Sequence, residues 1–349
     1  MRLVRTAFLA TTVLSTSATM AQADVNVVTS IKPVHSLVSA VMKGVGEPSL
    51  LVEGAGSPHT YALKPSQARK LQDADLVFWM SHDLEAFLEK SIEGIAANAK
   101  SVPLMDSHGL IKLEFREGGA FDSHGHEDEG HDDHGKDDHD EHKHDDHGHD
   151  DHGKDDHDEH KHDDHGHDDH DDHGHGEADP HVWLDPVNAK AMVHEIEEAL
   201  AEADPAHAAT YEANAEALMA KLDGLVDEID AELEPVKGRG YVVFHDAYQY
   251  FENRFGVSAV GSITVSPEVL PGAERVSELQ EKVRELGATC VFSEPQFEPK
   301  LVATVTENTN AGTGVLDPLG ASIKDGPELY FTLIRTMAKS LKDCLAKTG

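Results

Sequence analysis

The chain has 349 residues, of which 29 are basic and 66 are acidic, so its formal net charge is −37. A surface this acidic attracts cations and disfavours nucleic acid, which excludes a nucleic-acid-binding role from the expected functions. Without a leader and one low-complexity tract, both described below, about 270 residues remain, enough for two domains of ordinary size.

The first 23 residues are typical of a secretory signal peptide. Two arginines, Arg2 and Arg5, are followed by a mostly apolar run at 7–20 and by the small-residue cleavage motif A-Q-A. The apolar run is short and interrupted by threonine and serine, which argues against a transmembrane anchor. We therefore expect an exported protein whose mature chain begins at Asp24.

In the next hundred residues, apolar strand-like stretches alternate with helix-like ones. This order is typical of a parallel sheet covered by helices on both faces. Strands are predicted at 25–30, 49–52, 76–80 and 101–105, and helices at 36–42, 66–74 and 84–97.

A histidine tract then interrupts the alternation. Residues 124–175 hold 18 histidines, 23 acidic residues, four lysines and no hydrophobic side chain, and the block 131–148 recurs unchanged at 149–166. With no apolar groups to bury, the tract is not expected to fold. A merely solvated acidic run would not need so much histidine, and imidazole and carboxylate groups are ligands of divalent metals, zinc above all. We expect a disordered, metal-handling loop at 122–178.

The second half of the chain predicts one long helix and a second lobe. After a helix from Pro186 to about residue 203, apolar residues from Tyr211 to Leu233 recur every three or four positions, which predicts a long amphipathic helix. Further strands are predicted at 241–244, 258–263, 289–292 and 314–316, and helices at 248–255, 274–286, 301–309 and 330–345. We predict an α/β protein with lobes at 24–203 and 236–349, joined by a helix at 204–235.

Four side chains could hold a single metal ion: His59, His181, His245 and Asp317. Three of them follow predicted strands, and open α/β sheets bind ligands beyond the carboxyl ends of their strands. Two fall in each lobe, so a cleft between the lobes could gather all four. Each also has a plainer explanation, because a histidine at a strand end is more often hydrogen-bonded and an aspartate before proline more often forms a turn.

The two cysteines, Cys290 and Cys344, are expected to form a disulfide, because disulfides persist in the compartments that exported proteins reach. In the chain-entropy model such a bond stabilises the fold by roughly 4 kcal/mol. The alternative, a pair of thiolate metal ligands, has no short-spaced partner to support it.

Five segments resemble the periplasmic metal-binding proteins of ABC importers, and among these the zinc-specific ZnuA type. The family's acidic, histidine-rich insertion also falls where the tract falls. The resemblance implies two Rossmann-like lobes with a rigid connecting helix, one metal in the interlobe cleft, a second-lobe disulfide matching Cys290 and Cys344, a permease partner and a periplasmic, monomeric protein. The segments are GSPHTYALKPSQARKLQDADLVFWM, DPHVWLDP, FHDAYQYFENRFG, SEPQF and LDPLG.

The same resemblance maps the metal ligands onto His59, His181, His245 and Asp317. Manganese-selective relatives are expected to carry a carboxylate at the third position, whereas His245 gives three imidazoles, which suit zinc. Some zinc relatives have an acidic residue before the first histidine, where this chain has Pro58. The fourth ligand is therefore expected to be Asp317 or a water molecule.

Three classes of function remain to be compared. A zinc hydrolase is disfavoured, because the chain has no H-E-x-x-H motif, no serine nucleophile elbow and no obvious general base beside the histidines. A pure storage protein would have no use for a cleft. We expect a non-enzymatic protein that captures Zn²⁺ for an importer, with the tract as a zinc buffer; the alternative is a carrier of manganese or another divalent metal.

Overall fold

The structure, a computed structural model, describes residues 25–116, 121, 178–264, 273–285, 290–298 and 300–347. The expected signal peptide and the histidine tract at 124–175 lie outside these residues. Among the described helices, none combines the length and apolarity that crossing a membrane requires.

The first lobe is built on a four-stranded parallel sheet in the order β2-β1-β3-β4. Its outer face is covered by α2 and α3, whose apolar side chains form a small separate core with β1 and β3. The strands are β1 (Val27–Thr29), β2 (Ser49–Leu50), β3 (Leu76–Trp79) and β4 (Lys100–Pro103), and the helices are α1 (Lys32–Val41), α2 (Pro65–Gln72) and α3 (Ala86–Ile95).

The second lobe repeats this plan, with a parallel sheet in the order β6-β5-β7-β8. Its outer face packs on α7 and α8. The strands are β5 (Tyr241–His245), β6 (Ala259–Thr264), β7 (Cys290–Ser293) and β8 (Gly312–Val315), and the helices are α6 (Gln249–Phe255), α7 (Ala273–Glu285) and α8 (Lys300–Thr306). The prediction of two α/β lobes with parallel sheets is confirmed.

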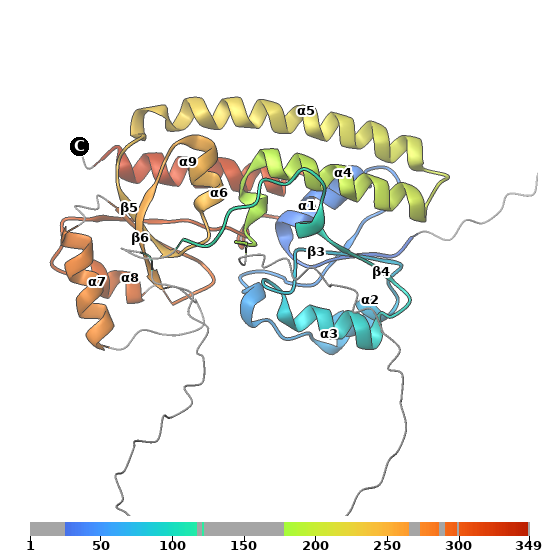
Figure 1. Cartoon of the computed structure of the whole chain (residues 1–349), viewed down its shortest axis with the longest axis horizontal. Coiled ribbons are helices and arrows are strands. Elements are labelled where there is room, and N and C mark those ends of the chain that lie inside the picture. The colour runs from blue at the N-terminus through green and yellow to red at the C-terminus, as the bar shows by residue number, and fades with distance from the viewer. Residues whose placement is uncertain are drawn as a thin grey trace, which may run out of the picture.

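Long helices join the two lobes on one side of the molecule. Helix α5 (Ala208–Leu233) runs across both lobes, with α4 (Pro186–Ala203) and α9 (Leu329–Leu345) beneath it (Figure 1). The predicted apolar stripe of α5 is buried along its whole length, from Tyr211 to Leu233. Its side chains belong to one continuous hydrophobic core that includes residues of both lobes. The lobes therefore share their main core and are not connected by a flexible hinge.

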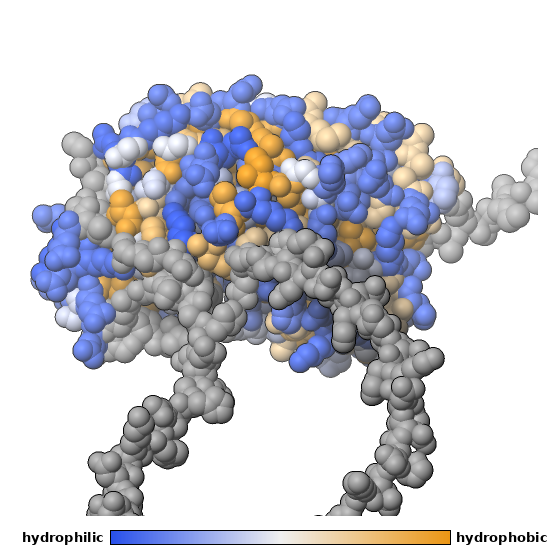
Figure 2. All heavy atoms as spheres, in the orientation of Figure 1, coloured by the Kyte–Doolittle hydropathy of each residue, from blue (hydrophilic) through white to orange (hydrophobic). Residues whose placement is uncertain are grey.

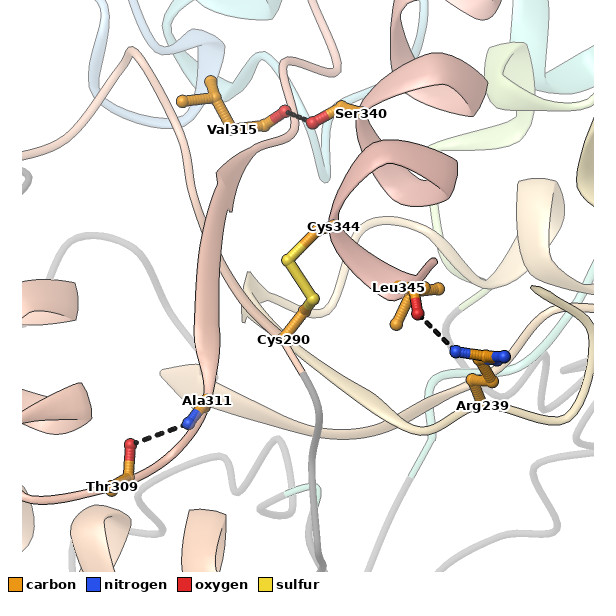
Figure 3. The surroundings of a disulfide bond; sticks show 8 residues. All are labelled: Arg239, Cys290, Thr309, Ala311, Val315, Ser340, Cys344 and Leu345. Carbon is orange, nitrogen blue, oxygen red and sulfur yellow. Dashed lines mark hydrogen bonds between the residues drawn. A yellow bond between two sulfur atoms is a disulfide. The ribbon is translucent and has the colours of Figure 1, made fainter. Parts of the chain in front are cut away.

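The structure contains the bond between Cys290 and Cys344 (Figure 3). Cys290 is the first residue of β7 and Cys344 lies near the end of α9, so the disulfide ties the closing helix to the second sheet. A hydrogen bond from the Ser340 hydroxyl to the carbonyl of Val315 (2.6 Å) adds a second link, from α9 to β8.

Figure 2 shows hydrophilic side chains over most of one face, with hydrophobic ones in patches between them. Among the described residues, the large hydrophobic side chains that are exposed are Ile95, Ile111 and Val315. They belong to three separate segments of the chain, and a small number of exposed apolar side chains is ordinary on a protein surface.

Candidate metal centre

Three of the four predicted ligands come together between the lobes. Donor atoms of His59, His181 and His245 lie within 4.8 Å of one another, and among the described residues this is the one such group of three. The ring centroids are 5.3 Å apart for His181 and His245, and 5.6 and 5.9 Å from these two rings to His59. Three imidazole nitrogens at this spacing can bind one ion.

Short turns and a strand end place these histidines. His59 lies in a 3₁₀ turn (Pro58–Thr60) after β2, His181 directly precedes another (Val182–Leu184), and His245 is the last residue of β5. Cross-lobe bonds fix the second turn: the indole of Trp183 donates to the carbonyl of Pro318 (2.9 Å), and the hydroxyl of Tyr330 donates to the carbonyl of Trp183 (2.7 Å). The backbone that follows His181 is thus held in place by hydrogen bonds to the second lobe.

The space between the three rings is small and mostly apolar. It measures about 10 Å³ and is lined by Pro58, Trp183, Phe297 and Pro318 in addition to the histidines. Such a volume is about that of one water molecule. His181 packs against the ring of Trp183 (5.2 Å) and His245 against that of Phe297 (6.0 Å). The space accommodates one small ion.

Buried carboxylates hold two of the histidines from behind. Nδ1 of His181 donates to Oδ1 of Asp179 (2.6 Å), and Nδ1 of His245 donates to Oε1 of Glu294 (2.7 Å). Each bond fixes the ring so that its other nitrogen, Nε2, is free for a metal. Nε2 of His245 is buried and has no hydrogen-bond partner among the described residues. Because a buried polar atom without a partner is costly, this nitrogen fits a metal ligand.

Neither carboxylate was among the predicted site residues. A signal was nevertheless present, because Glu294 directly follows β7 and Asp179 precedes His181 by two residues. A carboxylate beside a ligand histidine is a common arrangement around protein metals. The sequence could therefore have suggested both residues.

The pKa values of His59 and His245 are shifted in opposite directions. Burial lowers the pKa of His59 well below its usual 6.5, and the neighbouring His181 and His245 lower it further. Burial also lowers the pKa of His245, but the carboxylate of Glu294 outweighs this effect and leaves the pKa raised. Because a metal needs the neutral ring, His59 stays ready to bind at a lower pH than His245 does.

Asp317, the fourth predicted ligand, lies outside the group of three histidines. Its Oδ1 accepts hydrogen bonds from Nε2 of Gln296 and from the backbone N–H groups of Leu319 and Gly320, and its Oδ2 accepts from that of Ala321 (2.6 Å). In this conformation the side chain shapes a turn, which is the plainer role that the D-P dipeptide allowed.

Two α/β lobes around a pocket of three histidines, each lobe supplying ligands, define a metal-binding protein of the interlobe-cleft class. The family model described as "Zinc-uptake complex component A periplasmic" matches residues 27–344, and the chain belongs to this family. The family consists of solute-binding transport components and not of enzymes.

Individual relatives agree with this assignment. The chain is 58% identical over 321 residues to the high-affinity zinc uptake system protein ZnuA of Brucella suis, covering 92% of both chains. It is 41% identical to the protein of that name from Paracoccus denitrificans, covering 95% of both. A crystal structure of a ZnuA has a TM-score of 0.68 at 23% identity, with 93% of this chain and 100% of that chain covered. This last likeness shows the fold alone.

Proposed function

We propose that this protein captures Zn²⁺ between its lobes and delivers it to the membrane permease of an ABC importer in the periplasm. The observation that carries the proposal is the convergence of His59, His181 and His245 on one small space between the lobes. Three imidazoles form a donor set that suits tetrahedral Zn²⁺ better than Mn²⁺, which prefers oxygen ligands. The names of the two relatives described above point to the same ion.

We further propose that Asp317 completes the coordination of the ion. Its neighbours Pro318 and Leu319 already line the site. Oδ2 of Asp317 accepts only the bond from Ala321 among the described residues, so coordination through this oxygen leaves the three bonds to Oδ1 in place. The alternative fourth ligand is a water molecule.

Asp317→Asn separates these two possibilities, because an amide is a much weaker zinc ligand than a carboxylate. Its oxygen can still accept the three hydrogen bonds that Oδ1 receives, although the bond from Ala321 to Oδ2 is lost. We expect the variant to bind Zn²⁺ at least about 10-fold more weakly, with a changed absorption spectrum of the Co²⁺-loaded protein. An unchanged affinity and an unchanged cobalt spectrum would assign the fourth position to water.

The histidine tract is proposed to buffer zinc close to the cleft. It ends only a few residues before His181, so ions that it holds are at a high local concentration near the site. Imidazole must be neutral to bind, and its reference pKa is about 6.5. Binding to the tract should therefore weaken below about pH 6.

Competitive zinc titration against a chelator tests both parts of the proposal. The mature protein should show one tight site and several weaker ones, and a version lacking 124–175 should keep only the tight site. Loss of the tight site in the shortened protein would mean that the tract is the receptor. Retention of all the sites would remove the buffering role.

Export by cleavage after residue 23 and a monomeric state complete the proposal. Mass spectrometry of the exported protein should give a chain that begins at Asp24. Light scattering should give the mass of one chain with and without zinc.

A further inference from the structure

The two chain segments that flank the histidine tract meet at the boundary between the lobes. Glu114 and Ala178 form an antiparallel β-bridge, and the backbone N–H of Asp179 donates to the carbonyl of Leu113 (2.9 Å). We call these two segments, 113–116 and 178–181, the neck. The second of them ends in the ligand His181.

Helix α6 of the second lobe forms hydrogen bonds with both segments of the neck. The amide of Gln249 donates to the carbonyl of Glu114 (3.0 Å) and to Oδ2 of Asp179 (2.7 Å). The hydroxyl of Tyr250 donates to the carbonyl of Asp179 (2.7 Å) and accepts from the N–H of Leu113 (2.9 Å). Asp179 is the carboxylate behind His181, so α6 holds the support of that ligand.

Arg116 connects the other half of the neck to the strand that carries His245. Its guanidinium donates to both carboxylate oxygens of Asp246, which directly follows His245, and to Oε2 of Glu252 on α6 (2.6 Å). Both acidic side chains are 4% exposed. The arginine also lies over the ring of Phe121, 4.0 Å from its centroid. A planar guanidinium bound to two buried carboxylates fixes direction as well as distance.

We propose that Arg116 is a positioning residue of the metal centre, which holds His181 and His245 in register through the neck and α6. The inference rests on the proposed function, because it needs a tight zinc site in the cleft. It also means that the tract is attached to the same hydrogen-bonded unit that supports two of the ligands. Arg116 itself binds no metal.

Whether the removal of Arg116 weakens or strengthens zinc binding distinguishes positioning from simple electrostatics. Removing a positive charge close to a cation site strengthens the attraction of the site for Zn²⁺, especially when Asp246 beside His245 is left without its partner. Loss of positioning has the opposite effect, because a ligand that is no longer held must be ordered when the ion binds. Weaker binding in the absence of Arg116 is therefore the signature of positioning.

The test compares Arg116→Gln with Arg116→Lys in the full-length mature protein, by chelator competition with Zn²⁺ and by the absorption spectrum with Co²⁺. We expect Arg116→Gln to weaken the tight site by about 10- to 100-fold and to change the cobalt spectrum, since supporting residues of metal ligands have effects of this size. Arg116→Lys should recover part of the loss. If Arg116→Gln does not fold, the double variant Arg116→Gln/Glu252→Gln is used in its place. This variant also removes the charge of the buried Glu252 carboxylate, which otherwise loses its partner.

Arg254→Gln is the matched control. Arg254 lies on α6 and, like Arg116, forms a two-pronged ion pair across the lobes, with Asp185 (2.7 Å for both bonds), but it does not touch the neck. Arg254→Gln should bind Zn²⁺ at the tight site with an affinity within about threefold of that of the parent protein.

Unchanged or tighter zinc binding in Arg116→Gln would overturn the inference, as would an equal loss in Arg254→Gln. A parent protein without a tight site would instead refute the proposed function, and the inference with it.

Discussion

At the scale of single residues, the candidate metal centre contains carboxylates that support its histidines from behind. Asp179 and Glu294 each accept a hydrogen bond from Nδ1 of a proposed ligand, His181 and His245 respectively. Both are almost fully buried, so each bond is formed in a medium of low dielectric constant, where it is strong. The two acidic side chains thereby decide which nitrogen of each ring faces the metal.

Glu294→Gln should therefore weaken zinc binding although the residue is not a ligand. A neutral amide makes a weaker bond to His245 than a carboxylate does, and we expect a loss of about 10-fold or more in affinity. Chelator competition measures it. Glu85→Gln, another buried glutamate but one bonded to backbone N–H groups, is the control and should bind zinc as the parent protein does.

Glu85 itself should make the stability of the fold depend on pH. Burial raises its pKa from 4.5 to about 7, although hydrogen bonds, including those from Met80 and Ser81, act in the opposite direction. Between these two pH values the folded protein holds a proton that the unfolded chain releases, so this group makes the fold less stable as the pH rises. The stabilisation that the protonated Glu85 gives to the fold is complete below about pH 4.5 and is lost by about pH 7.

Urea unfolding of Glu85→Gln and of the parent protein between pH 4.5 and 8 checks this dependence. The glutamine cannot ionise, so the free energy of unfolding of the variant should rise relative to the parent by on the order of 3 kcal/mol across the window and then level off. A difference that stays constant with pH would show that Glu85 titrates alike in both states.

At the scale of elements, strand β7 links a covalent bond to the metal centre. The strand begins at Cys290, which is bonded to Cys344 in α9, and Glu294 follows its other end. The hydrogen bonds of β7 to its neighbours β5 and β8 also hold the strand in place. Its carboxyl end therefore does not depend on the disulfide alone.

Removing the disulfide should lower stability and spare the metal site. For Cys290→Ala/Cys344→Ala, whose cysteines are 54 residues apart, the chain-entropy model gives a loss of about 4 kcal/mol in the free energy of unfolding. Denaturant unfolding of the metal-free protein measures this loss, and zinc competition at low temperature should give the affinity of the parent protein. A parallel loss of zinc affinity would show that the bond also orders the end of β7.

Most elements follow from local patterns in the sequence, and the deviations have physical causes. Helix α1 begins at Lys32 and not at the predicted Ser36, because Pro33 is well suited to the first turn of a helix. The long α5 agrees closely with its predicted stripe, because seven regularly spaced apolar residues leave no other way to bury them. Element boundaries set by proline are thus harder to predict than those set by periodicity.

The three histidines could be predicted from strand ends and from the family's motifs, but the supporting neck could not. Arg116 and Asp246 are 130 residues apart, and no periodicity links a basic residue beside a low-complexity tract to an acid after a strand. Asp317 stays a predicted ligand, since the same D-P dipeptide fits both a ligand and a turn.

At the scale of the whole molecule, the shared hydrophobic core restricts how the lobes move. Side chains of α1, α4, α5 and α9 pack with residues of both sheets in one continuous cluster. Large apolar interfaces between domains oppose rigid-body motion, because separating the domains exposes that surface to water. The metal site is therefore largely formed before the ion arrives.

Distance measurements between spin labels at Glu93→Cys in α3 and Ala303→Cys in α8 test this rigidity. These positions are exposed and lie in different lobes. We expect the mean distance to change by less than about 2 Å when zinc binds, as in other preorganised sites. A shift of several ångströms, or two distances in the metal-free protein, would show that the lobes open and close.

The bridge between Glu114 and Ala178 also bears on how the histidine tract can change in evolution. Because the two ends of the insertion are paired directly, the number of residues between them can vary without displacing either end. For a flexible chain, the entropy of closing a loop grows only with the logarithm of its length, so a second copy of the 18-residue block, which has no hydrophobic side chain, costs less than about 1 kcal/mol. Under the proposed buffering role, tandem duplication raises the zinc capacity by whole blocks while the fold and the cleft stay as they are.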